Sequence, residues 1–378
     1  MTERVTLKSP ESVRAAPPMR RTLYAGERGQ GLALLREAPF VHVASTDADG
    51  APMLKVVHGV VLEDRWLVFH GAPAGEKTSA LGRDAVISAS RPVAVVPSYL
   101  IDPQRACPAT TYYESVQVHG RLEPIEDPDL KAAALQALME RHQPEGGHVP
   151  ITASDPLYRA AVRGLLVVRV ALDQLSCKLK LGQNRKPHQL AQVLAGLWRR
   201  GLEGDPRAID RLVEANPAPE ALPDFLLGPS GARLRCHLHH EAHLEAAGRL
   251  LEGAYWNVGV SAAQIARAFA GSSARVGAVD SAGELVGAAR AVSDDAKRAW
   301  IYDVMVAPEW RVRGLGRALM GLLLDHPRVR GVRSVLLSTR DADPFYEKLG
   351  FVKVLERDRG GWRSVMMEKG SREAALRR

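Results

Sequence analysis

One stretch, residues 301–324, constrains the fold of this chain more than any other, because a strand, a turn and a helix follow one another there. Ile301 to Val306 predicts a strand, Pro308 ends it, and Gly314 to Leu324 predicts an amphipathic helix. The first N–H groups of such a helix have no intrahelical partners and carry the positive end of its dipole. We therefore expect this turn to bind an anion, and a pyrophosphate fits it.

Glycine and arginine at the start of this helix support the same prediction. Gly314 and Gly316 have no Cβ, so backbone donors can approach phosphate oxygens closely. Arg311, Arg313 and Arg317 add positive charge around the same point. Isolated glycine spacings also occur by chance in turns and helix caps, so a second motif is needed.

That second motif is present. Arg311-x-x-Gly314-x-Gly316 has the spacing of the acetyl-CoA signature of GCN5-related N-acetyltransferases (GNAT), and the block from Leu336 to Phe351 follows where that family needs one. The order of predicted elements across Arg233 to Lys369 also resembles this family. The resemblance implies a mixed α/β GNAT fold that uses acetyl-CoA to acetylate a primary amine.

The resemblance also implies roles for individual residues. An amide of the strand would polarise the thioester carbonyl, and Tyr346 would give a proton to the departing CoA thiolate. Alternatively, Tyr346 packs within an ordinary amphipathic helix. The residues expected to contact acetyl-CoA are Val304, Met305, Val306, Arg311, Val312, Arg313, Gly314, Leu315, Gly316 and Arg317.

The general base is a separate question. Asp303 shares a predicted strand face with Ile301 and Met305, and it is the carboxylate nearest the expected thioester position. Asp303 is therefore a catalytic candidate, with two alternatives: it orients the substrate ammonium, or it bonds a neighbouring loop. Tyr255-Trp256 and Arg290 are weaker candidates for the acceptor wall. The acceptor would be a small-molecule amine or a protein N-terminal or lysine amine.

The N-terminal half is predicted to be rich in β-strands, with few helices, which indicates a small barrel. The predicted helices are 27–37, 128–142 and 188–200, and the predicted strands are 40–45, 53–62, 66–70, 85–90, 115–123 and 165–172.

One loop of this half, from Val68 to Thr78, has a strand ending in His70, a stretch of glycine and proline, and then Lys77 at a helix start. It offers amides and a cation to a phosphate. Together with segments 113–120 and 177–185, it resembles the pyridoxamine 5′-phosphate oxidase-like FMN-binding split barrels, above all their nitroimidazole-resistance and flavin-nucleotide-binding branches. The resemblance covers roughly Arg21 to Gly201 and implies FMN bound in a homodimer.

Within that resemblance, Lys77 would hold the FMN phosphate with help from Lys55. The remaining expected contacts are His70, Gly71 and Ser115 at the ribityl chain or ring edge, and Lys178, Lys180 and Gln183 closing the site. For Lys77, Ser115 and His70 the structural alternatives are an exposed lysine, a solvent-facing serine and a histidine bonded to nearby backbone.

Domain boundaries follow from residues 216–232, where four prolines and two glycines interrupt the flanking helical patterns. We predict an α+β two-domain chain: an FMN-binding split β-barrel over 1–215, a linker over 216–232 and a GNAT domain over 233–378. Lys plus Arg against Asp plus Glu is 27 against 26 over residues 1–232 and 24 against 17 over residues 233–378. The basic second half suits an anionic nucleotide, although a solvated basic surface explains most of it equally well.

Composition excludes other classes. No apolar run approaches a membrane span and residues 1–8 lack an apolar signal core, so a cytoplasmic chain is expected. Cys107, Cys177 and Cys236 are far apart, and we expect neither a disulfide framework nor a metal site. Segment 178–185 is similar to one in barrel proteins that are negative transcriptional regulators, but the almost neutral charge of its half argues against nucleic-acid binding.

The sequence thus predicts an N-acetyltransferase fused to an FMN-binding barrel. Two alternatives stay open: an FMN-dependent oxidoreductase with an auxiliary GNAT domain, and a regulator that senses acetyl-CoA or flavin.

Overall fold

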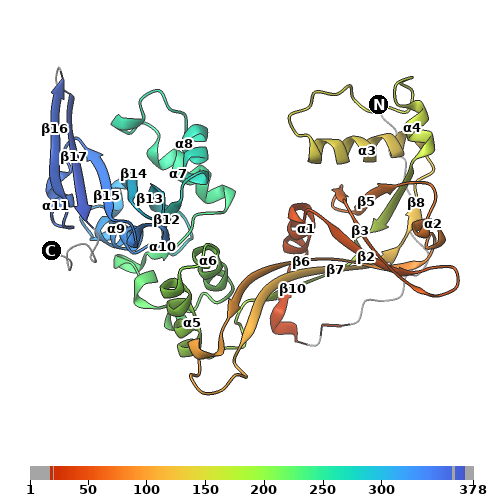
Figure 1. Cartoon of the computed structure of the whole chain (residues 1–378), viewed down its shortest axis with the longest axis horizontal. Helices are drawn as coiled ribbons and strands as arrows, with labels where there is room; N and C mark the ends of the chain where they lie inside the picture. The colour runs from red at the N-terminus through yellow and green to blue at the C-terminus, as the bar shows by residue number, and fades with distance from the viewer. Residues whose placement is uncertain (1–17, 20, 360–361, 371–378) are drawn as a thin grey trace. The chain divides into compact units, whose positions relative to one another are not determined.

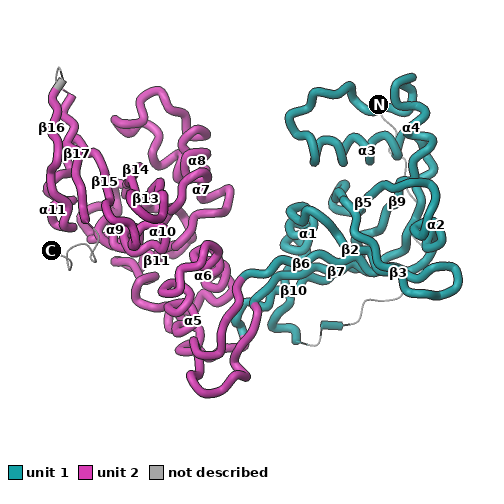
Figure 2. The backbone as a smooth tube through the Cα atoms, in the orientation of Figure 1, with its two compact units in different colours: residues 1–93, 112–183 teal, residues 94–111, 184–378 magenta. Residues whose placement is uncertain are grey.

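The computed structural model describes residues 18–19, 21–359 and 362–370. It divides into two compact units (Figure 2): residues 1–93 with 112–183, and residues 94–111 with 184–378. Residues 1–8, on which the predicted localisation depends, lie outside the described residues. No helix in the described part of the chain combines the length and apolar character needed to cross a membrane.

The first unit is a split barrel of two sheets, with strand orders β1-β10-β7-β6-β2-β3 and β4-β5-β9-β8. Its strands are β1 (Ala25–Gly26), β2 (Val41–Thr46), β3 (Pro52–Val57), β4 (Val60–Leu62), β5 (Trp66–Gly71), β6 (Asp84–Val96), β7 (Thr110–Arg121), β8 (Glu123–Pro124), β9 (Leu166–Ala171) and β10 (Gln174–Lys180). Its helices are α1 (Arg28–Glu37), α2 (Glu76–Ser79), α3 (Pro128–His142) and α4 (Arg159–Gly164).

Alternating burial along the long strands produces the barrel core. On β7, Val116 and Val118 are buried and Ser115 and Gln117 between them are more accessible. Helix α3 covers a second core through Leu135 and Leu138, beside Trp66.

The single strand predicted over residues 53–62 is wrong, because β3 and β4 belong to different sheets. The chain changes sheet at Gly59, where a Cβ would lie only 3.1 Å from the Leu67 side chain. Close packing at this corner therefore favours glycine.

The second unit has one seven-stranded sheet, in the order β11-β12-β13-β14-β15-β17-β16 (Figure 1). Only β14 and β15 are parallel among its recorded pairs. The strands are β11 (Arg233–Arg235), β12 (Ala274–Val279), β13 (Leu285–Ser293), β14 (Arg298–Val306), β15 (Ser334–Thr339), β16 (Val352–Arg359) and β17 (Trp362–Gly370). The helices are α5 (Pro187–Arg200), α6 (Asp205–Ala215), α7 (Glu241–Leu251), α8 (Ala262–Ala270), α9 (Leu315–Leu324), α10 (Pro327–Arg330) and α11 (Asp343–Glu347).

Helices cover both faces of this sheet. Ala288 of β13 packs with Leu251 of α7 and Phe269 of α8. Its neighbour Gly287, which faces the other way in a strand, leaves room for Leu319 of α9: a Cβ at Gly287 would lie 2.6 Å from that side chain. Thus α9 packs on the face opposite α7 and α8.

Helices α5 and α6 pack with the C-terminal domain. The indole Nε1 of Trp198 donates to Asp325 at 2.6 Å, and Arg330 donates to the Trp198 carbonyl at 3.0 Å. Asp210 accepts hydrogen bonds from the backbone N–H groups of Cys236 and His237. The compact units therefore separate at 183/184 in this part of the chain. The predicted domain boundaries at 215 and 233, which follow the sequence motifs, place these helices with the barrel and stay a prediction.

Candidate active site and cofactor sites

The candidate active site begins where two parallel strands separate. Strands β14 and β15 pair only from Arg298 to Trp300, opposite Ser334 to Leu336. Beyond these pairs a cavity of about 360 Å³ opens, and residues of both strands line it. Its lining includes Tyr255, Trp256, Arg290, Asp303, Val304, Ser338, Arg340, Tyr346 and Trp362. A gap of this kind, between strands whose edges no longer pair, admits an extended acyl carrier and leaves backbone donors available to it.

A β-bulge places Asp303 at this cavity. Ala288 pairs with Met305 and Arg290 pairs with Tyr302, so β14 carries one extra residue, and Asp303 has a φ of 53°. Across the bulge Ile301 pairs with Ala291 and Met305 with Ala288, so these two residues lie on opposite faces, and the expectation that Asp303 shares one regular strand face with both is wrong.

The carboxylate of Asp303 is occupied on both oxygens. Oδ2 accepts from Arg290 Nε at 2.6 Å, and Oδ1 accepts from Trp256 Nε1 at 2.9 Å. The Asp303 side chain is 7% exposed. These contacts correspond to the alternative in which Asp303 bonds a neighbouring loop, since Trp256 lies in the segment between α7 and α8.

Tyr346 lies in α11 and lines the same cavity. Its ring is buried and packs edge-on against Phe345 and Phe351. Burial, followed by the neighbouring Tyr255, raises the pKa of Tyr346 to about 12. The phenol therefore keeps its proton at neutral pH, the state that a general acid requires.

The anion loop joins β14 to α9. Gly314 is the N-cap of α9 in the left-handed region, with a φ of 86°, and no side chain in the described residues caps that helix. Val312 also has a positive φ, 56°, and is fully exposed. A β-branched residue in this conformation is strained, and such strain persists where a loop has a binding role. The uncapped N–H groups and this curved backbone fit a pyrophosphate.

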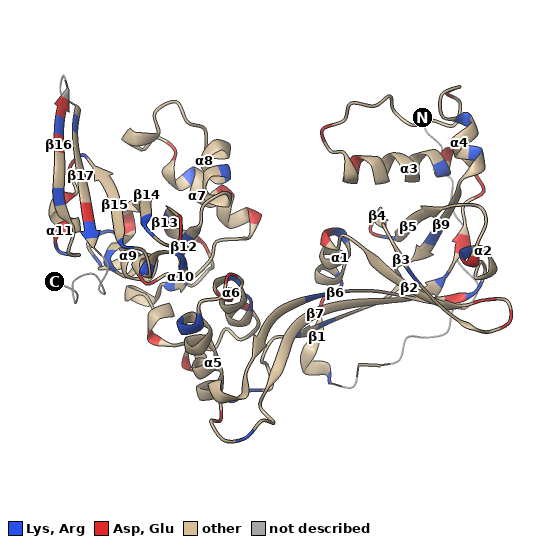
Figure 3. Ribbon diagram, in the orientation of Figure 1, with Lys and Arg blue, Asp and Glu red and all other residues tan. Residues whose placement is uncertain are grey.

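Three arginines belong to this loop and to the first turn of α9; Figure 3 colours Lys and Arg blue along the ribbon. Arg311, Arg313 and Arg317 are exposed. Arg311 folds back onto the end of β14: its Nε donates to the Val306 carbonyl at 3.1 Å, and its Nη2 lies 3.7 Å from Met305 Sδ. The ten residues assigned to acetyl-CoA thus lie in two groups, 304–306 at the end of β14 and 311–317 in the loop and first turn of α9.

Three further residues at the cavity were not singled out from the sequence: Arg340, Trp362 and Arg363. The Arg340 guanidinium lies 3.8 Å from the Tyr255 ring centroid, and the Arg340 backbone N–H donates to the Tyr255 hydroxyl. Arg363 donates to both oxygens of Asp343. Sequence reasoning had no signal for them, because β17 and the turn after β15 meet Tyr255 only in the folded sheet.

The predicted FMN residues form two groups in the barrel. In the first group, the Lys77 side chain packs over Gly71: a Cβ at Gly71 would lie 2.9 Å from the Lys77 ammonium. Lys55 forms an ion pair with Glu76. Burial, followed by the charge of Lys77, lowers the pKa of His70. In this cluster the Lys77 ammonium lies close to the Gly71 backbone. A cation beside accessible backbone fits a phosphate group.

In the second group, Ser115 of β7 and Lys178 of β10 are direct cross-strand partners, and Lys178 and Lys180 lie 5.4 and 5.7 Å from the Tyr113 ring centroid. Gln183 binds its own turn instead. Its Oε1 accepts from the Leu181 N–H at 2.8 Å, and its Nε2 donates to the Leu179 carbonyl at 2.7 Å. Gln183 therefore closes the turn after β10.

Comparison with known proteins covers both halves. Residues 27–179 match the model of the pyridoxamine 5′-phosphate oxidase family, and residues 242–351 match that of the acetyltransferase (GNAT) family. The chain is 40% identical over 75 residues to the uncharacterized N-acetyltransferase ycf52 of Porphyra purpurea. That match covers 20% of this chain and 43% of the relative, so less than half of the relative's length is matched.

Two other similarities extend over more of the related protein. Glucosamine 6-phosphate N-acetyltransferase of Trypanosoma brucei brucei is 38% identical over 125 residues, covering 29% of this chain and 80% of that protein. A solved structure described as a 5-nitroimidazole antibiotic resistance protein, from Bacteroides thetaiotaomicron, is 25% identical, with a TM-score of 0.34, over 41% of this chain and 85% of that one. The chain carries an N-terminal pyridoxamine 5′-phosphate oxidase-like domain and belongs, through its C-terminal domain, to the GNAT acetyltransferase family.

Proposed function

We propose that the protein transfers the acetyl group of acetyl-CoA to a primary amine in the cavity between β14 and β15. The observation that carries this proposal is the placement of Tyr346 and the unpaired part of β14 around one cavity, on the strand that leads into the uncapped start of α9. The loop from Arg311 to Gly316 would hold the pyrophosphate. An amide between Val304 and Val306 would donate to the thioester carbonyl oxygen as negative charge develops on it.

The neutral amine attacks the carbonyl carbon, the new C–N bond forms, and the C–S bond breaks. The thiolate takes the proton of the Tyr346 hydroxyl, and the amine gives up its extra proton to solvent or a base. Asp303 remains a candidate for that base, either directly or through water. Its bonds to Arg290 and Trp256 favour a positioning role, in which it holds the acceptor wall.

The experiment is an assay of CoA thiol release with a panel of amines, including amino sugars, polyamines and peptides with free N-terminal or lysine amines. Acetylated product is confirmed by mass spectrometry. The proposal expects amine-dependent thiol release that Tyr346→Phe suppresses, whereas release independent of any amine would contradict it.

We propose in addition that the barrel binds FMN, as a homodimer. The cluster of Lys55, His70, Gly71 and Lys77 supports a phosphate site. Strand β3 lies at the end of its sheet and carries Leu54 and Val56, which are 64% and 56% exposed. Such an apolar edge supports burial against a second copy. Size-exclusion chromatography with light scattering tests this: Leu54→Lys with Val56→Lys should yield monomer, and an unchanged dimer would reject this surface.

A further inference from the structure

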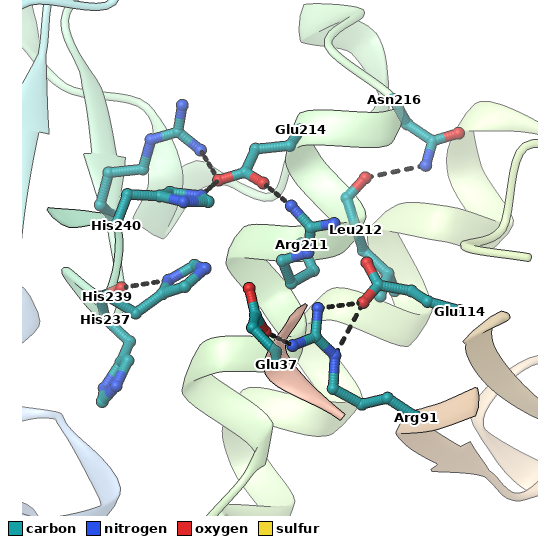
Figure 4. Close-up of polar contacts among 11 residues, drawn as sticks. Glu37, Arg91, Glu114, Arg211, Leu212, Glu214, Asn216, His237, His239 and His240 are labelled. Atoms are coloured by element: carbon teal, nitrogen blue, oxygen red, sulfur yellow. Dashed lines mark hydrogen bonds and ion pairs between the residues drawn. The ribbon is translucent and has the colours of Figure 1, made fainter. Parts of the chain in front are cut away.

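Three potential metal ligands meet in the second unit, away from the acetyl-CoA loop in sequence. Glu214 lies in the last turn of α6, and His239 and His240 immediately precede α7 (Figure 4). One donor atom from each of the three lies within 4.8 Å of the other two. We infer that Glu214, His239 and His240 form a site for a divalent transition-metal ion of the zinc type.

His239 is held in the orientation of a metal ligand. Its Nδ1 lies 3.0 Å from the His237 carbonyl oxygen and must donate to it, since a carbonyl only accepts. The lone pair is therefore on Nε2. That nitrogen is buried, and no described residue gives it a hydrogen-bond partner. A backbone carbonyl on one ring nitrogen and an open lone pair on the other is the usual arrangement of a metal-binding histidine.

Glu214 and His240 complete the set. Glu214 Oε1 accepts from His240 Nε2 at 2.8 Å, and the other oxygen, Oε2, accepts from Arg211 at 2.6 Å. Arg211 thus fixes the carboxylate while Oε1 faces the histidines, as Figure 4 shows. A metal ion would take the place of the hydrogen atom between His240 Nε2 and Glu214 Oε1, with the imidazole proton carried on Nδ1 instead.

The geometry suits three ligands and an open position. Zinc bonds to nitrogen and oxygen are about 2.0–2.2 Å, which places tetrahedral ligands about 3.3 Å apart. The donors therefore need to close from at most 4.8 Å, and His240 can move because its side chain is 40% exposed. The same exposure gives an entry path and room for a water as fourth ligand. His237 is not a ligand, since its Nε2 lies 3.0 Å from the Arg275 guanidinium.

Neighbouring charges select among cations. Arg235 lies 3.8 Å from Glu214 Oε1, in addition to Arg211 on Oε2. One carboxylate that already faces two guanidinium groups offers too little negative charge for Mg²⁺ or Ca²⁺, which need several oxygen ligands. Imidazole nitrogen instead favours Zn²⁺, Co²⁺ and Ni²⁺. A bound ion would join α6 to the segment before α7 and stabilise the unit by linkage.

The test uses the untagged full chain, stripped with a chelator and dialysed. Isothermal titration with Zn²⁺ should give one site per chain. Elemental analysis of the zinc-loaded chain, after dialysis to remove unbound ion, should find one zinc per chain. The melting temperature should rise with Zn²⁺ but not with Mg²⁺. His239→Ala and Glu214→Gln should weaken Zn²⁺ binding at least about tenfold. His240→Ala, at the more accessible of the two histidines, serves the same purpose if His239→Ala fails to fold.

The matched control is His188→Ala, an exposed histidine in the first turn of α5 of the same unit, which should bind Zn²⁺ like the unchanged chain. The inference is overturned if the unchanged chain takes up no zinc, or if His239→Ala, His240→Ala and Glu214→Gln all retain it with unchanged affinity.

Discussion

Arg290 and Asp303 form an ion pair across β13 and β14, with 2.6 Å between Arg290 Nε and Asp303 Oδ2. The pair sits at the β-bulge, and both residues line the cavity. Because Trp256 donates to the other oxygen, one carboxylate connects the sheet to the segment between α7 and α8, which we propose as the acceptor wall.

This relationship predicts how Asp303→Asn will behave. The amide oxygen can accept from only one of the two donors, so the wall should loosen and the KM for the amine should rise about tenfold, with a smaller change in kcat. The pH profile of kcat/KM separates this from base catalysis. If kcat/KM of Asp303→Asn still falls at acidic pH as in the wild type, Asp303 has the positioning role. If that fall disappears, Asp303 is the general base.

Tyr346→Phe should lower kcat by about a hundredfold or more, because the departing thiolate loses its proton donor, while acetyl-CoA affinity stays unchanged. Tyr302→Phe, an exposed tyrosine on the same cavity, is the control and should retain activity. An equal loss in both variants would remove Tyr346 as the acid.

The pKa of Tyr346 adds a test by pH. Since its folded pKa is about 12 and therefore above the usual value near 10, the protonated phenol is favoured in the fold, and this contribution to stability is complete below about pH 10 and is lost between about pH 10 and about pH 12. Ionisation of the Tyr346 hydroxyl should therefore not lower the wild-type kcat between about pH 7 and about pH 10. An alkaline limb in this range that Tyr346→Phe abolishes would contradict the raised pKa.

Two glycines of α9 give a matched pair. Gly314→Ala places a Cβ at a φ of 86° and should destabilise the second unit by about 1–2 kcal/mol while weakening acetyl-CoA binding. Gly321→Ala lies in the exposed middle of the same helix, with nothing within 4 Å of its Cβ, and should stabilise by about 0.5–1 kcal/mol. Denaturant unfolding measures both, and shifts of the same sign would reject the strained loop.

Lys77→Ala should lower flavin affinity about tenfold or more, since a charge-assisted bond to the phosphate is lost. The control is Lys131→Ala, on α3, which removes the same positive charge as Lys77→Ala and should bind flavin like the unchanged chain. Fluorescence titration with FMN measures both. If Lys77→Ala binds FMN as tightly as Lys131→Ala does, the phosphate lies elsewhere.

The sequence predicted features that depend on neighbours along the chain. The Gly314 cap, α9 and the position of Tyr346 follow from local turn chemistry and helical periodicity. The bulge at Asp303 could not be predicted, because it arises from the register of β14 against β13. The hydrogen bonds of the Gln183 amide within the turn after β10 could not be predicted either, because the closure of that turn depends on where the strand ends. The docking of Trp198 on Asp325 joins residues 127 positions apart and left no local signal.

Isothermal titration of the wild-type chain with acetyl-CoA tests the central claim most directly, with Gly314→Ala and Gly321→Ala measured beside it. We predict one site per chain, with affinity weakened in Gly314→Ala and retained in Gly321→Ala. Absence of acetyl-CoA binding by the folded wild-type chain at millimolar ligand would contradict the claim that this loop and cavity serve acetyl transfer.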